Sequence, residues 1–263
     1  MYFKIAIGMT AFLIGAVVWT MVANINTLDA KSEEIQTLYS YLGDDFLDYC
    51  NGLPFYENTE INTNTLNNET KMCLAYKYLD GSLIQLSSLE KKKKKDYCAF
   101  TKDKTFKLDP EGDSCQIEYI SFKDLEASYY TLFGQAIDNK EDFYLSGSRL
   151  CYFDNKESRY VCGTSNVNQT IQLGWTPTTY RIISKAKEKG NKIYIYDYYL
   201  AINDSSCYLT NSGNLENKKC SQKIKADTKY NNKFVLKNGQ QYLHVFEKDS
   251  KGDYHWISST IQK

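Results

Sequence analysis

The stretch TTYRIISKAKEKGNKIYIYDYYLAI, residues 178–202, decides the fold. Two runs of alternating polar and apolar residues flank a central Gly-Asn step, which favours a tight hairpin turn. Pairing about this turn predicts that Ala186 lies opposite Ile195 and that Ile182 lies opposite Tyr199. The same pairing sets lysines opposite tyrosines on the other face. This pattern is typical of an antiparallel sheet that contacts water on one side.

A second hairpin and two helices are predicted around this one. QQYLHVFEKDSKGDYHWISSTI, residues 240–261, turns through Asp249 to Gly252. FKDLEASYYTLFG, residues 122–134, has helical apolar spacing, with Ser121 as its cap and a glycine at its end. A shorter helix is expected from Met72 to Leu79. Short strands are expected near Cys207 and from Phe234 to Leu236.

This order of elements resembles the NTF2-like cone fold. The resemblance rests on the FKDLEASYYTLFG helix, the hairpin from Tyr180 to Ile202 and the closing YLHVFEKDSKGDYHWIS hairpin, and it covers about half of the chain. It implies a curved antiparallel sheet wrapped around helices, with a pocket, and it implies no activity. The predicted fold class is therefore α+β, with helices packed on a curved antiparallel sheet.

The N-terminus carries an apolar segment, IAIGMTAFLIGAVVWTMVA, from Ile5 to Ala23. Its 19 uncharged residues are almost long enough to cross the hydrocarbon core of a bilayer as a helix. The alternative is a cleaved signal peptide. However, a cut after Ala23 or after Ala30 would leave a small residue at only one of the two recognition positions that precede the cleaved bond. Lys4 precedes the segment and acidic residues follow it, which predicts a cytoplasmic N-terminus and an extracytoplasmic body.

Apolar residues recur at helical spacing from Leu28 to Cys50, so the membrane helix is expected to continue outward as a stalk. The predicted organisation has three parts. Residues 1–24 form a transmembrane signal-anchor, residues 25–96 a stalk and helical region, and residues 97–263 a disulfide-stapled β-rich extracytoplasmic domain.

Eight cysteines support an oxidising compartment. None belongs to a CxxC pair, and only two histidines are present, so a zinc site is disfavoured. Neighbours in sequence fall at distances that suit bridged hairpins, although eight cysteines allow 105 connectivities. The disulfide candidates, in the order of their sequential pairing, are Cys50 with Cys73, Cys98 with Cys115, Cys151 with Cys162, and Cys207 with Cys220.

The sequence contains no motif for catalysis, for a cofactor or for a metal, and no residue is predicted for any of these roles. The 32 basic residues equal the 32 acidic ones, so no nucleic-acid partner is indicated. Pairing about Ser250-Lys251 places His244 and His255 on one sheet face, whereas a shift by one residue separates them. Both histidines are interpreted as ordinary strand residues, whose replacement by Gln costs about 1 kcal/mol each.

The leading hypothesis is a single-pass cell-membrane protein, held through Ile5 to Ala23, whose extracytoplasmic domain binds a protein partner or a small ligand. The first alternative is a structural or assembly component of a cell-surface complex. The second alternative is a hydrolase.

Overall fold

The structure is a computed structural model of the chain. It describes residues 25–43, 50, 54–56, 59–79, 84–86, 97–99, 104–107, 117–146, 149–164, 178–203, 207–209, 222–223 and 229–262.

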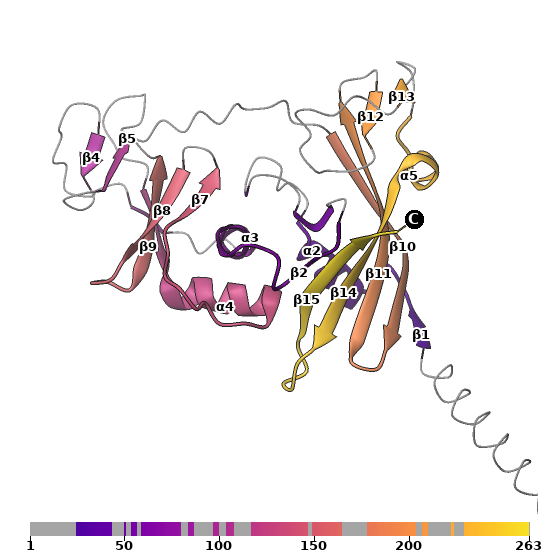
Figure 1. Cartoon of the computed structure of the whole chain (residues 1–263), viewed down its shortest axis with the longest axis horizontal. Coiled ribbons are helices and arrows are strands. Elements are labelled where there is room, and N and C mark those ends of the chain that lie inside the picture. Colours follow the sequence, from indigo (N-terminus) through magenta and orange to yellow (C-terminus); the bar gives the residue numbers. More distant parts are fainter. Residues whose placement is uncertain are drawn as a thin grey trace, which may run out of the picture.

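Two antiparallel sheets form the frame of the molecule (Figure 1). The larger sheet has the strand order β1-β10-β11-β14-β15-β2, and β12 and β13 extend from β11. Its strands are β1 (Ile25–Leu28), β2 (Ile61–Asn62), β10 (Thr178–Lys189), β11 (Lys192–Asn203), β12 (Cys207–Leu209), β13 (Gln222–Lys223), β14 (Gln240–Lys248) and β15 (Tyr254–Ile261).

The smaller sheet has the order β3-β6-β9-β8-β7, and a separate two-stranded ribbon pairs β4 with β5. These strands are β3 (Ile84–Leu86), β4 (Tyr97–Ala99), β5 (Thr105–Lys107), β6 (Ile117–Ser121), β7 (Phe143–Ser146), β8 (Arg149–Asp154) and β9 (Arg159–Thr164).

Helices fill the space between the two sheets. Figure 1 shows α3 and α4 side by side there, with α4 reaching from β6 to β15. One continuous apolar core joins residues of both sheets and of the helices between them. The described residues therefore form an α+β fold of antiparallel sheets and helices, as the sequence predicts. The helices are α2 (Glu33–Ser40), the 3₁₀ helix η2 (Pro54–Tyr56), α3 (Asn68–Tyr78), α4 (Phe122–Phe133) and α5 (Asn232–Asn238).

Helix α4 confirms the prediction from its spacing and end signals. The Ser121 side chain accepts a hydrogen bond from the backbone N–H of Asp124, which caps the first turn. Gly134 ends the helix with a left-handed φ of 64°. An added Cβ at Gly134 would lie 2.9 Å from the His255 ring, so a glycine is required there for packing as well.

Two expectations about local structure are wrong, and a third, the helix from Met72 to Leu79, is confirmed with an earlier start. The apolar segment does not continue as one helix into Leu28 to Cys50, because Ile25–Leu28 form a strand paired with β10, and the expected helical spacing is confirmed only over α2. Helix α3 begins at Asn68, four residues earlier than predicted, because Asn67 caps it. Phe234 to Leu236 lie in α5, whose N-cap is Asn231. In each case a local hydrogen bond or strand partner outweighs the apolar pattern.

Within the described part of the chain, no helix is long and apolar enough to span a membrane. The predicted span, Ile5 to Ala23, lies outside the described residues.

The β10–β11 hairpin confirms the predicted register only near its turn. Ala186 lies opposite Ile195, as expected. A bulge at Ser184 then shifts the pairing, so Ile182 lies opposite Tyr198 and not opposite Tyr199. The extra residue of a bulge bends the strand and leaves one residue unpaired. Periodicity alone does not predict it.

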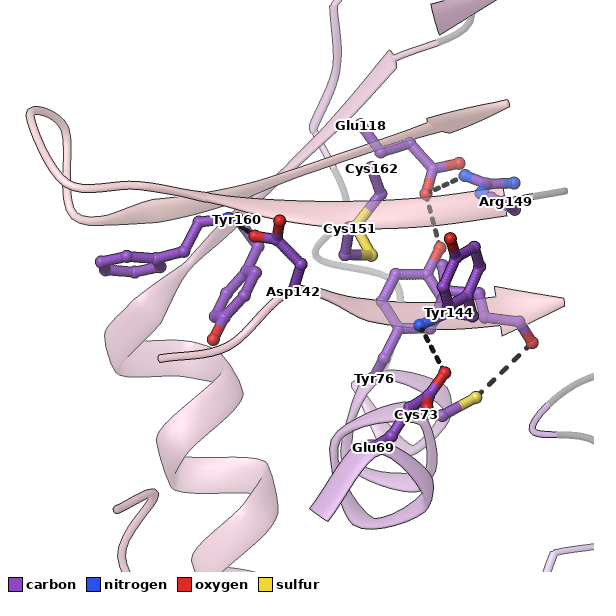
Figure 2. Close-up of a disulfide and its surroundings, with 12 residues drawn as sticks. Glu69, Cys73, Tyr76, Glu118, Asp142, Tyr144, Arg149, Cys151, Tyr160 and Cys162 are labelled. Carbon is purple, nitrogen blue, oxygen red and sulfur yellow. Dashed lines mark hydrogen bonds and ion pairs between the residues drawn. A yellow bond between two sulfur atoms is a disulfide. The ribbon is translucent and has the colours of Figure 1, made fainter. Parts of the chain in front are cut away.

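Two disulfides join residues that the structure describes, and both are sequential pairs from the prediction. Cys50 is bonded to Cys73, and Cys151 to Cys162. The second bridge joins directly opposed residues of β8 and β9 (Figure 2). The side chains of the other four candidates, Cys98, Cys115, Cys207 and Cys220, lie outside the described residues. The two bridges indicate an oxidising environment.

Candidate functional site

A carboxylate and a histidine are buried together in the larger sheet. Asp197 of β11 and His244 of β14 are each 0% exposed. His244 Nε2 lies 3.1 Å from Asp197 Oδ1, and His244 Nδ1 lies 2.6 Å from Oγ of Ser259, its partner on β15. The Trp256 indole N–H donates to the same Oγ at 2.9 Å.

One assignment of protons satisfies this chain of groups. Trp256 donates to Ser259 Oγ, the Ser259 hydroxyl donates to His244 Nδ1, and the N–H of His244 Nε2 donates to Asp197. Every hydrogen bond then points toward the carboxylate.

Two tyrosines from the N-terminal part of the chain complete the network. Tyr39 of α2 and Tyr56 of η2 donate their hydroxyls to Asp197 Oδ2 at 2.6 and 2.7 Å. The Arg181 guanidinium lies 4.5 Å from the centre of the Tyr39 ring and donates to backbone carbonyls just after α2. The network thus fastens α2 and η2 to the sheet. We call the five residues that carry it the Asp197 network: Tyr39, Tyr56, Asp197, His244 and Ser259.

Charge and burial act in opposite directions on these groups. Burial alone would raise the pKa of Asp197, but the contacts with His244, Tyr39 and Arg181 outweigh it and hold that pKa below its usual value. Burial raises the pKa of Tyr39 and Tyr56 well above the usual tyrosine value. Both phenols are therefore neutral donors to an ionised carboxylate.

The order serine, histidine, aspartate resembles that of a hydrolase triad, but this one lacks access to a substrate. A nucleophile must reach the reacting atom, and Ser259 is only 1% exposed. Its Oγ already accepts the Trp256 N–H, and the Tyr56 ring packs against His244 with 5.2 Å between ring centres. The arrangement therefore acts as a buried structural network.

A separate pocket of about 570 Å³ lies beside the β14–β15 turn. Its volume falls within the range of small-molecule sites. Helix α2 supplies one wall, α4 a second, and the residues after the turn a third. The lining residues are Glu33, Glu34, Thr37, Leu38, Tyr41, Tyr130, Thr131, Gly252, Asp253, Tyr254 and His255.

The pocket combines aromatic rings with carboxylates. Tyr41, Tyr130 and Tyr254 line it, one from each wall. The pKa of Tyr254 is raised to about 12, mainly by burial and also by its hydrogen bond to Glu188 and by the nearby Glu34. Burial also raises the pKa of Tyr41, with a smaller contribution from Asp253. The carboxylates of the pocket thus act on its aromatic walls.

His255 connects the turn to α4 at the edge of this pocket. Its Nδ1 lies 2.9 Å from the carbonyl of Thr131, so Nδ1 carries the proton and donates. Its Nε2 lies 3.3 Å from Asp249 Oδ2, yet this contact lacks the geometry of a hydrogen bond. The contact is therefore electrostatic, because the two atoms are close but are not aligned as a hydrogen bond requires. Tyr130 donates to the same Asp249 oxygen at 2.8 Å and holds the turn against α4.

The two histidines belong to separate networks. In the observed register His255 lies opposite Glu247 and Phe246 opposite Trp256, one residue away from the predicted pairing. The alternative register, which separates the histidines, is therefore the correct one. Among the described residues, no group of three or more His, Cys, Asp or Glu side chains is placed to hold a metal ion.

Sequence reasoning missed Asp197 as a site residue. In the run IYIYDYYLAI, Asp197 occupies a position that alternation assigns to the buried face, between Ile195 and Tyr199. A charged residue at such a position requires partners, because an unpaired buried charge is costly. That signal was present in the sequence, but the partners Tyr39, Tyr56 and His244 come from distant segments. Three-dimensional structure was needed to find them.

Comparison of the chain with protein-family models, with curated proteins and with solved structures finds no match.

Proposed function

We propose that this chain is a single-pass membrane-anchored protein whose extracytoplasmic domain binds a ligand in the pocket beside the β14–β15 turn. The observation that carries the proposal is the pocket itself, about 570 Å³ in volume and lined by three tyrosines and three carboxylates. The two disulfides support an oxidising location for the domain. The apolar segment from Ile5 to Ala23 supports the anchor.

The pocket lies at the end of the larger sheet where the first described strand begins. Ile25 pairs with Lys189, next to the β10–β11 turn. Asn191 of that turn donates to Glu247, near the start of the β14–β15 turn. Because Ile25 follows the apolar segment almost directly, an anchor there sets the pocket at the membrane-proximal end of the domain. Within this proposal, the NTF2-like cone fold remains the family that the element order resembles.

The orientation is tested with epitope tags at the two ends of the full chain in intact cells. An antibody should detect the C-terminal tag on intact cells and the N-terminal tag only after permeabilisation. Extraction with carbonate should leave the chain in the membrane fraction. A C-terminal tag that stays hidden until permeabilisation would overturn the extracytoplasmic assignment.

A further inference from the structure

We infer that the pocket binds an organic cation, an alkylammonium group of the kind carried by choline. This inference rests on the proposed binding function and names the class of its ligand. Three features carry it: the unpaired carboxylates, the aromatic walls, and the ammonium groups of the chain itself that already lie on those rings.

The carboxylates of the pocket have no cationic partner among the described residues. Glu33 and Glu34 extend from the first turn of α2, and Asp253 follows the β14–β15 turn. The ion pairs of the described residues involve other acids. Three negative charges around one concave site produce a field that attracts a cation and repels an anion.

The aromatic walls suit a cation that carries methyl or methylene groups. Quaternary ammonium ligands are bound over the faces of tyrosine and tryptophan rings, where the ring quadrupole attracts the charge and the apolar ring contacts the carbons. Tyr41, Tyr130 and Tyr254 provide three such rings around the pocket. A metal ion would instead require converging oxygen ligands, and no such group occurs in the described residues.

Two lysines of the chain show that these rings accept ammonium groups. Lys251 Nζ lies 4.8 Å from the centre of the Tyr130 ring, and Lys248 Nζ lies 4.9 Å from the centre of the Tyr254 ring. Both distances are within the range of cation–π attraction. The ring faces are therefore electrostatically suited to an ammonium group, and a ligand extends an arrangement that the turn already uses.

His255 adds an independent polar feature to the pocket wall. The side chain is more than nine-tenths buried, and its Nδ1 proton is committed to Thr131. Its Nε2 lies 3.3 Å from Asp249 Oδ2, without the geometry of a hydrogen bond.

Calorimetric titration of the full chain in maltoside micelles tests the inference. Choline chloride is compared at low ionic strength with 3,3-dimethyl-1-butanol, which has the same shape without the charge, and with sodium chloride. Choline is expected to bind at least about tenfold more tightly than the neutral analogue. The variant carrying Glu34→Gln and Asp253→Asn should bind choline about tenfold more weakly, since both side chains are exposed and their loss leaves the fold intact. Glu157→Gln, in the exposed turn of the smaller sheet, is the matched control and should bind like the parent.

The membrane and the solution are two sources of the same ammonium chemistry. A further titration therefore uses dihexanoylphosphatidylcholine below its micellar concentration. Tighter binding of this lipid than of choline identifies a lipid headgroup as the source of the ammonium group. Tighter binding of choline identifies a soluble amine as the source. Either result supports the inference. Equal binding of choline and its neutral analogue would overturn the cation inference and leave the binding role standing. An absence of choline binding, or an unchanged affinity in the double variant, would also overturn it. A C-terminal tag that an antibody detects only after permeabilisation would overturn the proposed role itself.

Discussion

Replacing His244 with leucine is expected to destabilise the protein far more than an average substitution does. Leucine has a similar volume and is apolar, so the change tests the two hydrogen bonds more than the packing. His244 is 0% exposed, and no water is expected to replace the lost donor to Asp197. The carboxylate would keep Tyr39 and Tyr56 on one oxygen and lose the donor to the other.

The expected loss is about 3–5 kcal/mol in the free energy of unfolding. A hydrogen bond to a charged group contributes about 1.5–3 kcal/mol, and a buried hydroxyl left without its acceptor costs about 1–3 kcal/mol. Their sum agrees with the value of about 3–5 kcal/mol found when one partner of a buried ion pair is removed. This exceeds the cost of about 1 kcal/mol that the sequence alone predicts for a strand histidine.

The assay is guanidinium unfolding of the oxidised chain, followed by tryptophan fluorescence. The midpoint should fall while the slope m stays unchanged, because the unfolded surface is the same. The source of the loss is isolated by repeating His244→Leu in an Asp197→Asn background. If the unpaired charge causes the loss, the substitution should cost at least about 1 kcal/mol less there. Additive effects of the two substitutions, or a loss near 1 kcal/mol for His244→Leu alone, would refute the reasoning.

Three further outcomes are expected. Tyr56→Phe should lower the free energy of unfolding by about 1.5–3 kcal/mol, because it removes only the hydroxyl bound to Asp197. The control is Tyr194→Phe, the same change at a partly exposed strand position without a described partner. It should change the free energy of unfolding by no more than about 0.5 kcal/mol. The pKa of Tyr254 is raised above its unfolded value, so the tyrosine's contribution to stability should be complete below about pH 10 and lost as pH rises through about 12. Unfolding midpoints measured across this pH range should therefore decline less in the Tyr254→Phe variant than in the parent protein. Peptide mapping without reductant should recover Cys151 linked to Cys162. Replacing both cysteines with serine should lower the free energy of unfolding by about 3 kcal/mol, and an unchanged unfolding midpoint would contradict this.

The sequence predicts well where short-range rules act alone. The cap at Ser121, the stop at Gly134 and the apolar face between them depend only on residues a few positions apart, and α4 follows them. The turn after Lys189 and the Ala186–Ile195 pair depend on local twist and alternation, and both are observed. Bridges between Cys151 and Cys162 and between Cys50 and Cys73 likewise join residues that are near in sequence.

The sequence predicts poorly where distant segments compete for a residue. The segment after the apolar run has helical spacing, yet Ile25–Leu28 pair with β10 and form the edge strand of the sheet, because β10 offers backbone partners that a solvated stalk lacks. The bulge at Ser184 changes the pairing of the whole outer half of the hairpin. The Asp197 network combines α2, η2, β11, β14 and β15, so no local pattern shows its members together.

Helix α2 links the Asp197 network to the pocket. Its buried side carries Ile35 and Tyr39, which are fixed to the core and to Asp197, and its polar side carries Glu33 and Glu34, which line the pocket. With eight residues, this helix is too short to be stable in isolation, so its position depends on tertiary contacts. The hydrogen bond from Tyr39 to Asp197 therefore helps to hold the helix that carries the acidic wall of the pocket. Under the proposed function, a network without access to solvent would contribute to binding by positioning the pocket residues that are exposed.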